Sequence, residues 1–158
     1  MKFNNLYKSL LEQNESFMFT ARNIGGRQKR YEQIAQQQIQ DYIKNGSKGD
    51  LNLTGMPIKS LPDGLKISSN LKLSNSSIET LPPGLIVHGD LYLNDTNIKT
   101  LPKRLKVGGW LNLMGSAIET LPKDLRAGVL YLPYTPISKK YTPKQLKQML
   151  PKVMEILT

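Results

Sequence analysis

Residues 51–70 read LNLTGMPIKSLPDGLKISSN, and the chain repeats this pattern at a period of twenty residues. The following rows are LKLSNSSIETLPPGLIVHGD at 71–90, LYLNDTNIKTLPKRLKVGGW at 91–110, LNLMGSAIETLPKDLRAGV at 111–129 and the partial row LYLPYTPI at 130–137. Every full row holds a Leu-x-Leu start, an isoleucine, a Leu-Pro pair and a later leucine at matching positions. One such coil cannot bury its own leucines, whereas stacked coils bury them as continuous columns. The repeat therefore predicts a solenoid of four to five coils.

The Leu-x-Leu start of each row predicts a short strand with both leucines facing inward and the residue between them facing outward. Successive strands then pair in parallel, about 4.8 Å apart, while the prolines, which lack an N–H, suit the opposite wall of the coil. Three glycines precede strands, where we expect positive φ angles: Gly89, Gly109 and Gly128. A column of hydroxyls is expected to bond turn backbone groups of the neighbouring coil: Ser76, Thr96, Ser116 and Thr135.

The rows resemble bacterial leucine-rich repeats of the short, roughly twenty-residue type. They look most like the small leucine-rich-repeat proteins of tailed phages, whose units read L-P-x-G-L-x-V-x-G-x-L-x-L-x-x-T-x-I. Residues 81–98, LPPGLIVHGDLYLNDTNI, fit that unit throughout, and the resemblance covers residues 50–137, although a hydroxyl column replaces the usual asparagine. The resemblance implies a leucine-rich-repeat solenoid that binds a macromolecule, usually a protein. It also implies a phage protein whose partner is a host or phage protein in the bacterial cytoplasm. One form of this function would be inhibition of a host defence system.

The open ends of a solenoid expose core leucines and need caps. Residues 1–49 predict a helical N-terminal cap, in which a loop over 14–26 separates a short first helix from a second helix over about 28–45. The first helix carries apolar residues at Phe3, Leu6, Leu10 and Leu11. The second has an apolar face with helical spacing, made of Tyr31, Ile34, Ala35, Gln38, Ile39, Tyr42 and Ile43. Asn45-Gly46 predicts its end.

Residues 138–158 predict a short helical C-terminal cap. Thr142-Pro143 is a typical helix start, and Pro151 is a stop. Leu146, Met149 and Leu150 form a stripe that we expect to cover the last coil, with the lysines of this segment outside. The caps and the repeats of residues 50–137 then form a single structural domain.

The composition excludes several classes of site. The chain has 158 residues, no cysteine and one histidine, His88, so cysteine nucleophiles, thiolate metal sites and multi-histidine sites are excluded. We expect a binding module rather than an enzyme, with no metal, no cofactor and no small-molecule substrate. The sequence has no apolar stretch of about 18 residues and no secretory signal at its start, so we expect no membrane contact and a cytoplasmic location.

Strand alternation indicates which residues face outward from the predicted sheet. Aromatic residues and methionine gather toward its C-terminal half, and these residue types are typical interface anchors. We therefore expect a protein partner to bind this face, through Tyr92, Trp110, Asn112, Met114, Tyr131, Tyr134 and Lys72. The alternative is that the rings only pack on one another across strands. A separate outward column of alternating sign predicts a structural charge ladder, formed by Lys59, Glu79, Lys99 and Glu119.

The net charge of +10 is unevenly distributed, with +4 in residues 1–49, +2 in residues 50–137 and +4 in residues 138–158. The basic ends carry the second hypothesis, in which nucleic acid binds an alternative basic patch. Its residues are Arg22, Arg27, Lys29, Arg30, Lys139 and Lys140. Because the repeats carry little net charge, we do not expect the sheet to be a nucleic-acid surface. The alternative is that these side chains are simply solvated.

Overall fold

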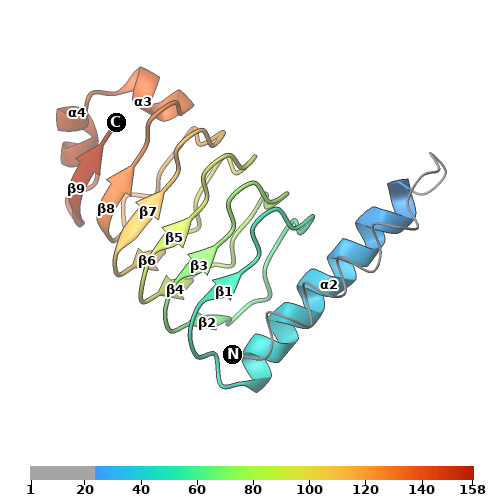
Figure 1. The fold of residues 1–158 in the computed structure, drawn as a ribbon. Coiled ribbons are helices and arrows are strands. Elements are labelled where there is room, and N and C mark those ends of the chain that lie inside the picture. The colour runs from blue at the N-terminus through green and yellow to red at the C-terminus, as the bar shows by residue number, and fades with distance from the viewer. Residues whose placement is uncertain (1–23) are drawn as a thin grey trace.

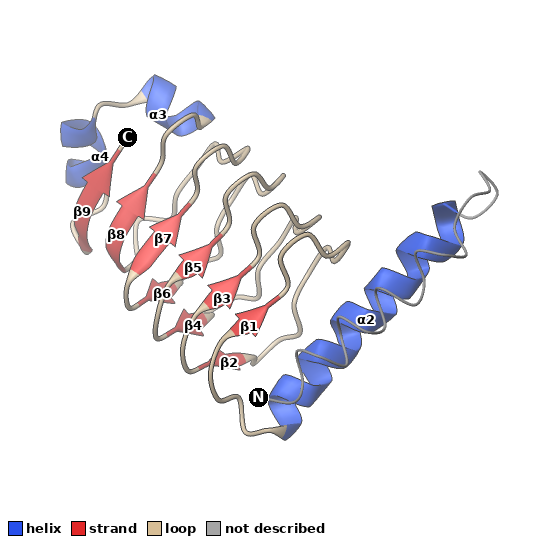
Figure 2. Cartoon of the chain, viewed as in Figure 1, coloured by secondary structure: helices blue, strands red, loops and turns tan. Residues whose placement is uncertain are grey.

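The computed structural model describes residues 24–158 and shows a parallel β-solenoid of about four turns, capped at both ends (Figure 1). One wall is a six-stranded sheet, here called the front sheet. Its strands in spatial order are β1 (Leu51–Asn52), β3 (Leu71–Lys72), β5 (Leu91–Tyr92), β7 (Trp110–Asn112), β8 (Ala127–Tyr131) and β9 (Val153–Leu157). The opposite wall is a three-stranded sheet, here called the short sheet, made of β2 (Lys66–Ile67), β4 (Ile86–Val87) and β6 (Lys106–Val107) (Figure 2).

The strand register follows the sequence repeat. Leu51 pairs with Leu71, Leu71 with Leu91, Leu91 with Leu111 and Leu111 with Leu130, and all five leucines are buried. The leucines two positions later are also fully buried, while the residues between them face outward. The predicted parallel stacking with alternating burial is therefore confirmed.

The glycines that precede the strands serve a different purpose from the predicted one. The φ angles of Gly89, Gly109 and Gly128 are not positive. A Cβ atom at Gly89 would instead collide with Oδ1 of Asn70, and one at Gly109 would collide with Oδ1 of Asp90. Glycine is needed at these two positions because a side chain of the preceding coil passes close to the backbone. At Gly128 the close atoms are instead backbone carbonyl oxygens of the preceding coil, 3.0–3.1 Å from where a Cβ atom would lie.

The buried hydroxyl column also differs from expectation. Ser76, Thr96 and Thr135 donate hydrogen bonds of 2.6–2.7 Å to the carbonyl oxygen three residues earlier in the same coil, not to the neighbouring coil. The fourth member, Ser116, is buried with no hydrogen-bond partner for its Oγ. A short side chain can bond locally in this way, so these hydroxyls stabilise the turn of their own coil.

The N-terminal cap is the helix α2 (Ile24–Lys44), which contacts β1. It begins before the predicted boundary, so the loop expected over 14–26 is wrong from Ile24 onward. Ala35, Ile39 and Tyr42 are buried, as predicted for this face, but Ile43 is 41% exposed because the contact stripe is narrower than the apolar pattern. The predicted first helix over Phe3–Leu11 lies outside the described residues.

Tyr42 joins the cap to the first coil. Its hydroxyl donates to the carbonyl oxygen of Ser47 at 2.9 Å and accepts from the backbone N–H of Ser68 at 3.2 Å. Ser68 follows β2, so one buried side chain connects the helix, the turn after it and the short sheet. Of the helices in residues 24–158, none combines the length and apolarity that crossing a bilayer requires.

The C-terminal cap holds two short helices, α3 (Pro136–Lys140) and α4 (Pro143–Met149), followed by β9. Thr142 forms the predicted N-cap of α4, with a reciprocal bond to Gln145. Leu146 and Leu150 are buried, but Met149 is 39% exposed, so it does not cover the last coil as predicted. The strand β9 was not expected. It pairs in parallel with β8 from Ala127↔Val153 to Tyr131↔Leu157 and closes the front sheet.

Two of the isoleucines of α2, Ile39 and Ile43, provide a matched test of the cap. Ile39→Ala removes a side chain that is 5% exposed, whereas Ile43→Ala removes one that is 41% exposed. We expect Ile39→Ala to lower the free energy of unfolding by about 2–4 kcal/mol and Ile43→Ala to lower it by less than about 1 kcal/mol. Denaturant unfolding measures both values. Equal losses would show that α2 does not pack on the first coil as described.

Candidate functional site

The outward side chains of the front sheet form two rows that cross its strands. One row contains Trp110, Val129 and Glu155, and the next contains Tyr92, Asn112, Tyr131 and Leu157. Over β7 and β8 the first row carries Trp110 and Val129, and the second carries Tyr131 beside the polar Asn112. The C-terminal half of the front sheet therefore holds an exposed apolar and aromatic surface with one polar side chain in it.

Trp110 and Tyr131 make the central contact of this surface. Their ring centroids are 6.1 Å apart with an interplanar angle of 57°, a tilted geometry that aromatic pairs favour. The contact is diagonal, because Trp110 pairs in register with Val129 and Tyr131 pairs with Asn112. Trp110 is 45% exposed despite this contact. The ring thus has one face supported and enough surface left for a partner.

Tyr134 lies in a turn where tyrosine is a poor fit to the backbone. The second residue of the turn that follows the front strand has a positive φ of 56–70° in every coil. The first four coils place Gly55, Asn75, Asp95 and Gly115 there. Glycine, asparagine and aspartate tolerate this conformation, but a tyrosine in it costs about 1–2 kcal/mol. Tyr134 has φ 60° and is 81% exposed. Its side chain therefore gains almost nothing from burial to offset the strain.

Tyr92 belongs to a polar network rather than to the aromatic pair. It pairs in register with Asn112, on the side of β7 away from Tyr131. Its hydroxyl donates to Oδ2 of Asp90 at 3.1 Å, and partial burial followed by this bond raises the pKa of Tyr92. The Tyr92 hydroxyl is therefore held by Asp90, in a polar part of the front sheet.

A ladder of side-chain acceptors explains why the strands begin where they do. Oδ1 of Asp50 accepts from the backbone N–H of Asn70 at 3.2 Å, Oδ1 of Asn70 accepts from that of Asp90 at 2.7 Å, and Oδ1 of Asp90 accepts from that of Trp110 at 2.8 Å. Each of these side-chain oxygens accepts the hydrogen bond of one backbone N–H group in the next coil. At Trp110 the ladder ends because indole offers no acceptor, and this position becomes available for an aromatic side chain.

Asn112 and Met114 belong to the structure of the face more than to its exposed surface. Oδ1 of Asn112 accepts from the backbone N–H of Met114 at 3.0 Å, which shapes the turn after β7. Both side chains are half-buried. Their side chains are therefore less accessible than those of Trp110 and Tyr134.

Lys72 lies apart from the aromatic pair. Its Nζ is 2.9 Å from Oδ2 of Asp50, and it projects from β3, two strands from β7. The Lys72 ammonium, followed by the Ser69 hydroxyl, holds the pKa of the Asp50 carboxyl well below its usual range. The same pair raises the pKa of Lys72. The charge of Lys72 is thus already matched within the face.

The residues of the alternative basic patch lie in two separate places. Arg27, Lys29 and Arg30 are on the first turns of α2, while Lys139 and Lys140 are in the last turn of α3 at the other end of the stack (Figure 1). Lys140 also lies over the ring of Tyr141, with its Nζ 5.2 Å from the centroid. Arg22 lies outside the described residues. The structure therefore does not bring the two basic clusters together.

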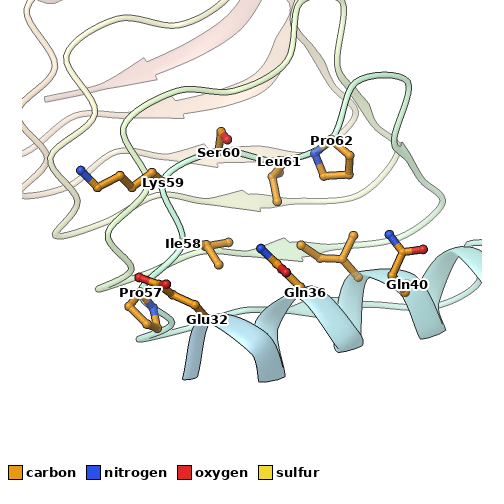
Figure 3. A pocket seen from close by; sticks show the side chains of 10 residues that line it. Glu32, Gln36, Gln40, Pro57, Ile58, Lys59, Ser60, Leu61 and Pro62 are labelled. Atoms are coloured by element: carbon orange, nitrogen blue, oxygen red, sulfur yellow. The ribbon is translucent and has the colours of Figure 1, made fainter. Parts of the chain in front are cut away.

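A groove with a volume of about 530 Å³ lies between α2 and the first coil (Figure 3). Glu32, Gln36 and Gln40 line it from the helix, and residues 57–62 line it from the coil. Across residues 24–158 no three His, Cys, Asp or Glu side chains gather as metal ligands would. His88, which follows β4, bonds through Nδ1 to the carbonyl oxygen of Ile67 at 2.9 Å.

Two residues of this surface, Val129 and Leu157, were not among the predicted partner-binding residues. Val129 pairs beside Trp110, and Leu157 pairs beside Tyr131 in β9. Both are partly exposed and extend the apolar surface to the last strand. The run VMEIL at 153–157 is rich in strand-forming residues and could have indicated β9.

Comparison of the chain with protein-family models, with curated proteins and with solved structures finds no match.

The Asp50–Lys72 pair predicts a dependence of stability on pH. Because the pKa of Asp50 is lower in the folded chain than the usual value of about 3.9, its contribution is present above that value and is lost as pH falls toward the folded pKa. Both side chains are more than a third exposed, so the contribution is below about 1 kcal/mol. We expect Asp50→Asn to lower the melting temperature at pH 6 and the difference from the native chain to shrink between pH 5 and pH 2. A difference that is constant across this range would contradict the ion pair.

Proposed function

We propose that this chain is a non-enzymatic, protein-binding solenoid of the leucine-rich-repeat type, and that the partner binds the C-terminal half of the front sheet. The anchors are Trp110, Tyr131 and Tyr134, and Val129 and Leu157 widen the apolar contact. This set is called the aromatic face below.

The observation that carries the proposal is Tyr134. An 81%-exposed aromatic side chain occupies a left-handed turn position where the other coils use glycine, asparagine or aspartate. Strain of this kind is typical of functional positions, because a residue that only had to form the turn would be one that tolerates it. A tyrosine that costs stability and lacks burial is best explained by contact with something outside the chain.

The support around Trp110 agrees with this interpretation. Interface anchors are effective when they are rigid before binding, since less side-chain entropy is then lost. The tilted contact with Tyr131 holds the indole in place while leaving 45% of Trp110 exposed. Tryptophan and tyrosine are also the residues most often found as hot spots.

We take the partner to be a bacterial protein, and the setting to be the cytoplasm, because the repeat resembles that of small tailed-phage proteins. A host protein is the expected class of partner, and interference with a host defence system is the activity that would follow from binding it.

The test is quantitative capture of the partner by the tagged, full-length chain from nuclease-treated bacterial lysate. We expect Trp110→Ala to weaken binding by about 2 kcal/mol, roughly 30-fold, without unfolding the chain. We expect Tyr134→Gly to weaken binding while raising the melting temperature, because glycine relieves the strain.

Ile86→Ala is the matched control, since Ile86 is 41% exposed but lies on the short sheet. It should leave capture unchanged. A partner that is retained by both aromatic variants, or lost equally with Ile86→Ala, would refute binding at the aromatic face.

A further inference from the structure

The walls of the solenoid differ in charge, although residues 50–137 sum to only +2. The front sheet of these residues carries three carboxylates and one lysine, which gives −2, and the ladder that contains Lys59 and Glu119 is neutral. The short-sheet wall, formed by β2, β4, β6 and the turns that lead into them, carries six cations and two carboxylates, which gives +4. The net charge of the repeats therefore hides a segregation of charge by wall.

Five of these six cations lie on the last two coils of that wall and are here called the basic wall: Lys103, Arg104, Lys106, Lys123 and Arg126. All five are exposed. None of them takes part in a salt bridge within residues 24–158. The nearest carboxylate in sequence, Asp124, accepts a hydrogen bond from the backbone N–H of Arg104 at 3.0 Å and so serves the turn.

The basic wall stacks like charges where the rest of the solenoid avoids doing so. Lys106 and Arg126 are bridge partners on adjacent coils, about 4.8 Å apart. Like charges directly opposite each other destabilise a sheet. In the charge ladder the same spacing is used for opposite charges, with Lys59 3.3 Å from Glu79 and Lys99 3.9 Å from Glu119.

Arg104 supplies a second, independent observation. The equivalent residues of the first two coils are Gly64 and Gly84, with φ angles of 73° and 72°. Arg104 adopts the same left-handed conformation at φ 62°, where glycine is the favoured residue. Arg104 thus occupies a strained turn position on an exposed wall whose stacked cations already repel one another. Strain of this kind is typical of functional positions, which indicates a binding role for the arginine charge.

We propose that the basic wall is a docking surface for the phosphate backbone of duplex DNA, separate from the aromatic face. Unpaired lysines and arginines on one rigid wall are the groups that neutralise phosphates. The short-sheet wall segments 62–68, 82–88, 102–108 and 122–128 contain no Phe, Tyr or Trp. Stacking on aromatic rings is how proteins hold single strands, so their absence from these segments favours a duplex. The contacts would position DNA without reading its sequence.

The experiment measures binding of the full-length chain to a labelled 20-base-pair duplex by fluorescence anisotropy across a salt series. We expect binding at low salt that weakens steeply as salt rises. Lys106→Gln combined with Arg126→Gln should weaken binding by tenfold or more and reduce the slope of log K against log salt by nearly 2.

The matched control is Lys59→Gln combined with Lys99→Gln, which removes the same net charge from the paired ladder and should leave the slope unchanged. Arg104→Gly should lower the affinity for DNA and raise the melting temperature by about 2–4 °C. If Arg104 had only a structural role, its replacement would lower the melting temperature. A lower affinity for DNA together with a higher melting temperature therefore indicates a role in binding.

Several results would overturn the proposal. One is a native chain that does not bind the duplex at low salt, and another is equal weakening by the two double variants. A third is loss of binding only when Arg27, Lys29 and Arg30 are replaced, which would assign DNA to the terminal cluster. Equal competition by polyglutamate would assign the wall to an acidic protein, and tighter binding of a single strand would exclude duplex recognition.

Discussion

The structure depends on the burial of leucine columns by stacked coils in a common register. No coil can bury its own leucines, so each coil is stable only when its neighbour stacks on it in register. In that register Leu91 lies over Leu71 and Leu111 lies over Leu91. A shift of one residue would turn every outward side chain inward. The register therefore determines both the core and the two outer walls, and all recognition chemistry is a consequence of it.

Because the core needs only the inward positions, the outward positions are free to vary along the stack. Most are polar and tie neighbouring coils together, as Asp50, Asn70 and Asp90 do through the backbone of the next coil. Two positions instead depart from what the turn favours, Tyr134 beyond the front sheet and Arg104 on the opposite wall. In each case a residue with an unfavourable backbone conformation is kept on the surface, one aromatic and one cationic. On this basis we propose a protein partner for the front sheet and duplex DNA for the opposite wall.

The sequence alone was sufficient for the coils because their period places identical residues one coil apart. It was not sufficient for features that depend on contacts between coils. The close passage of Asn70 beneath Gly89 cannot be seen in a single row, so the glycine was assigned to a turn conformation. The strand β9 lacks the Leu-x-Leu spacing, and its pairing with β8 joins segments separated by a helical cap. Ile43 and Met149 were expected in the core because a helical pattern cannot show how wide the contact is. The outward aromatic residues could be predicted from the alternation of inward and outward positions along each strand. The basic wall could not be predicted from the net charge of residues 50–137, because carboxylates elsewhere in the repeats reduce that charge to +2.

The most direct test of the account is the environment of Trp110, the single tryptophan of the chain. If the register is correct, Leu111 faces the core and Trp110 faces solvent beside Tyr131. The account then predicts red-shifted tryptophan emission that acrylamide quenches in the folded chain. It also predicts that Trp110→Ala changes the free energy of unfolding by less than about 1 kcal/mol, while Leu111→Ala lowers it by about 3–5 kcal/mol. Blue-shifted, quencher-protected emission together with a loss of several kcal/mol for Trp110→Ala would place the indole in the core and contradict the register.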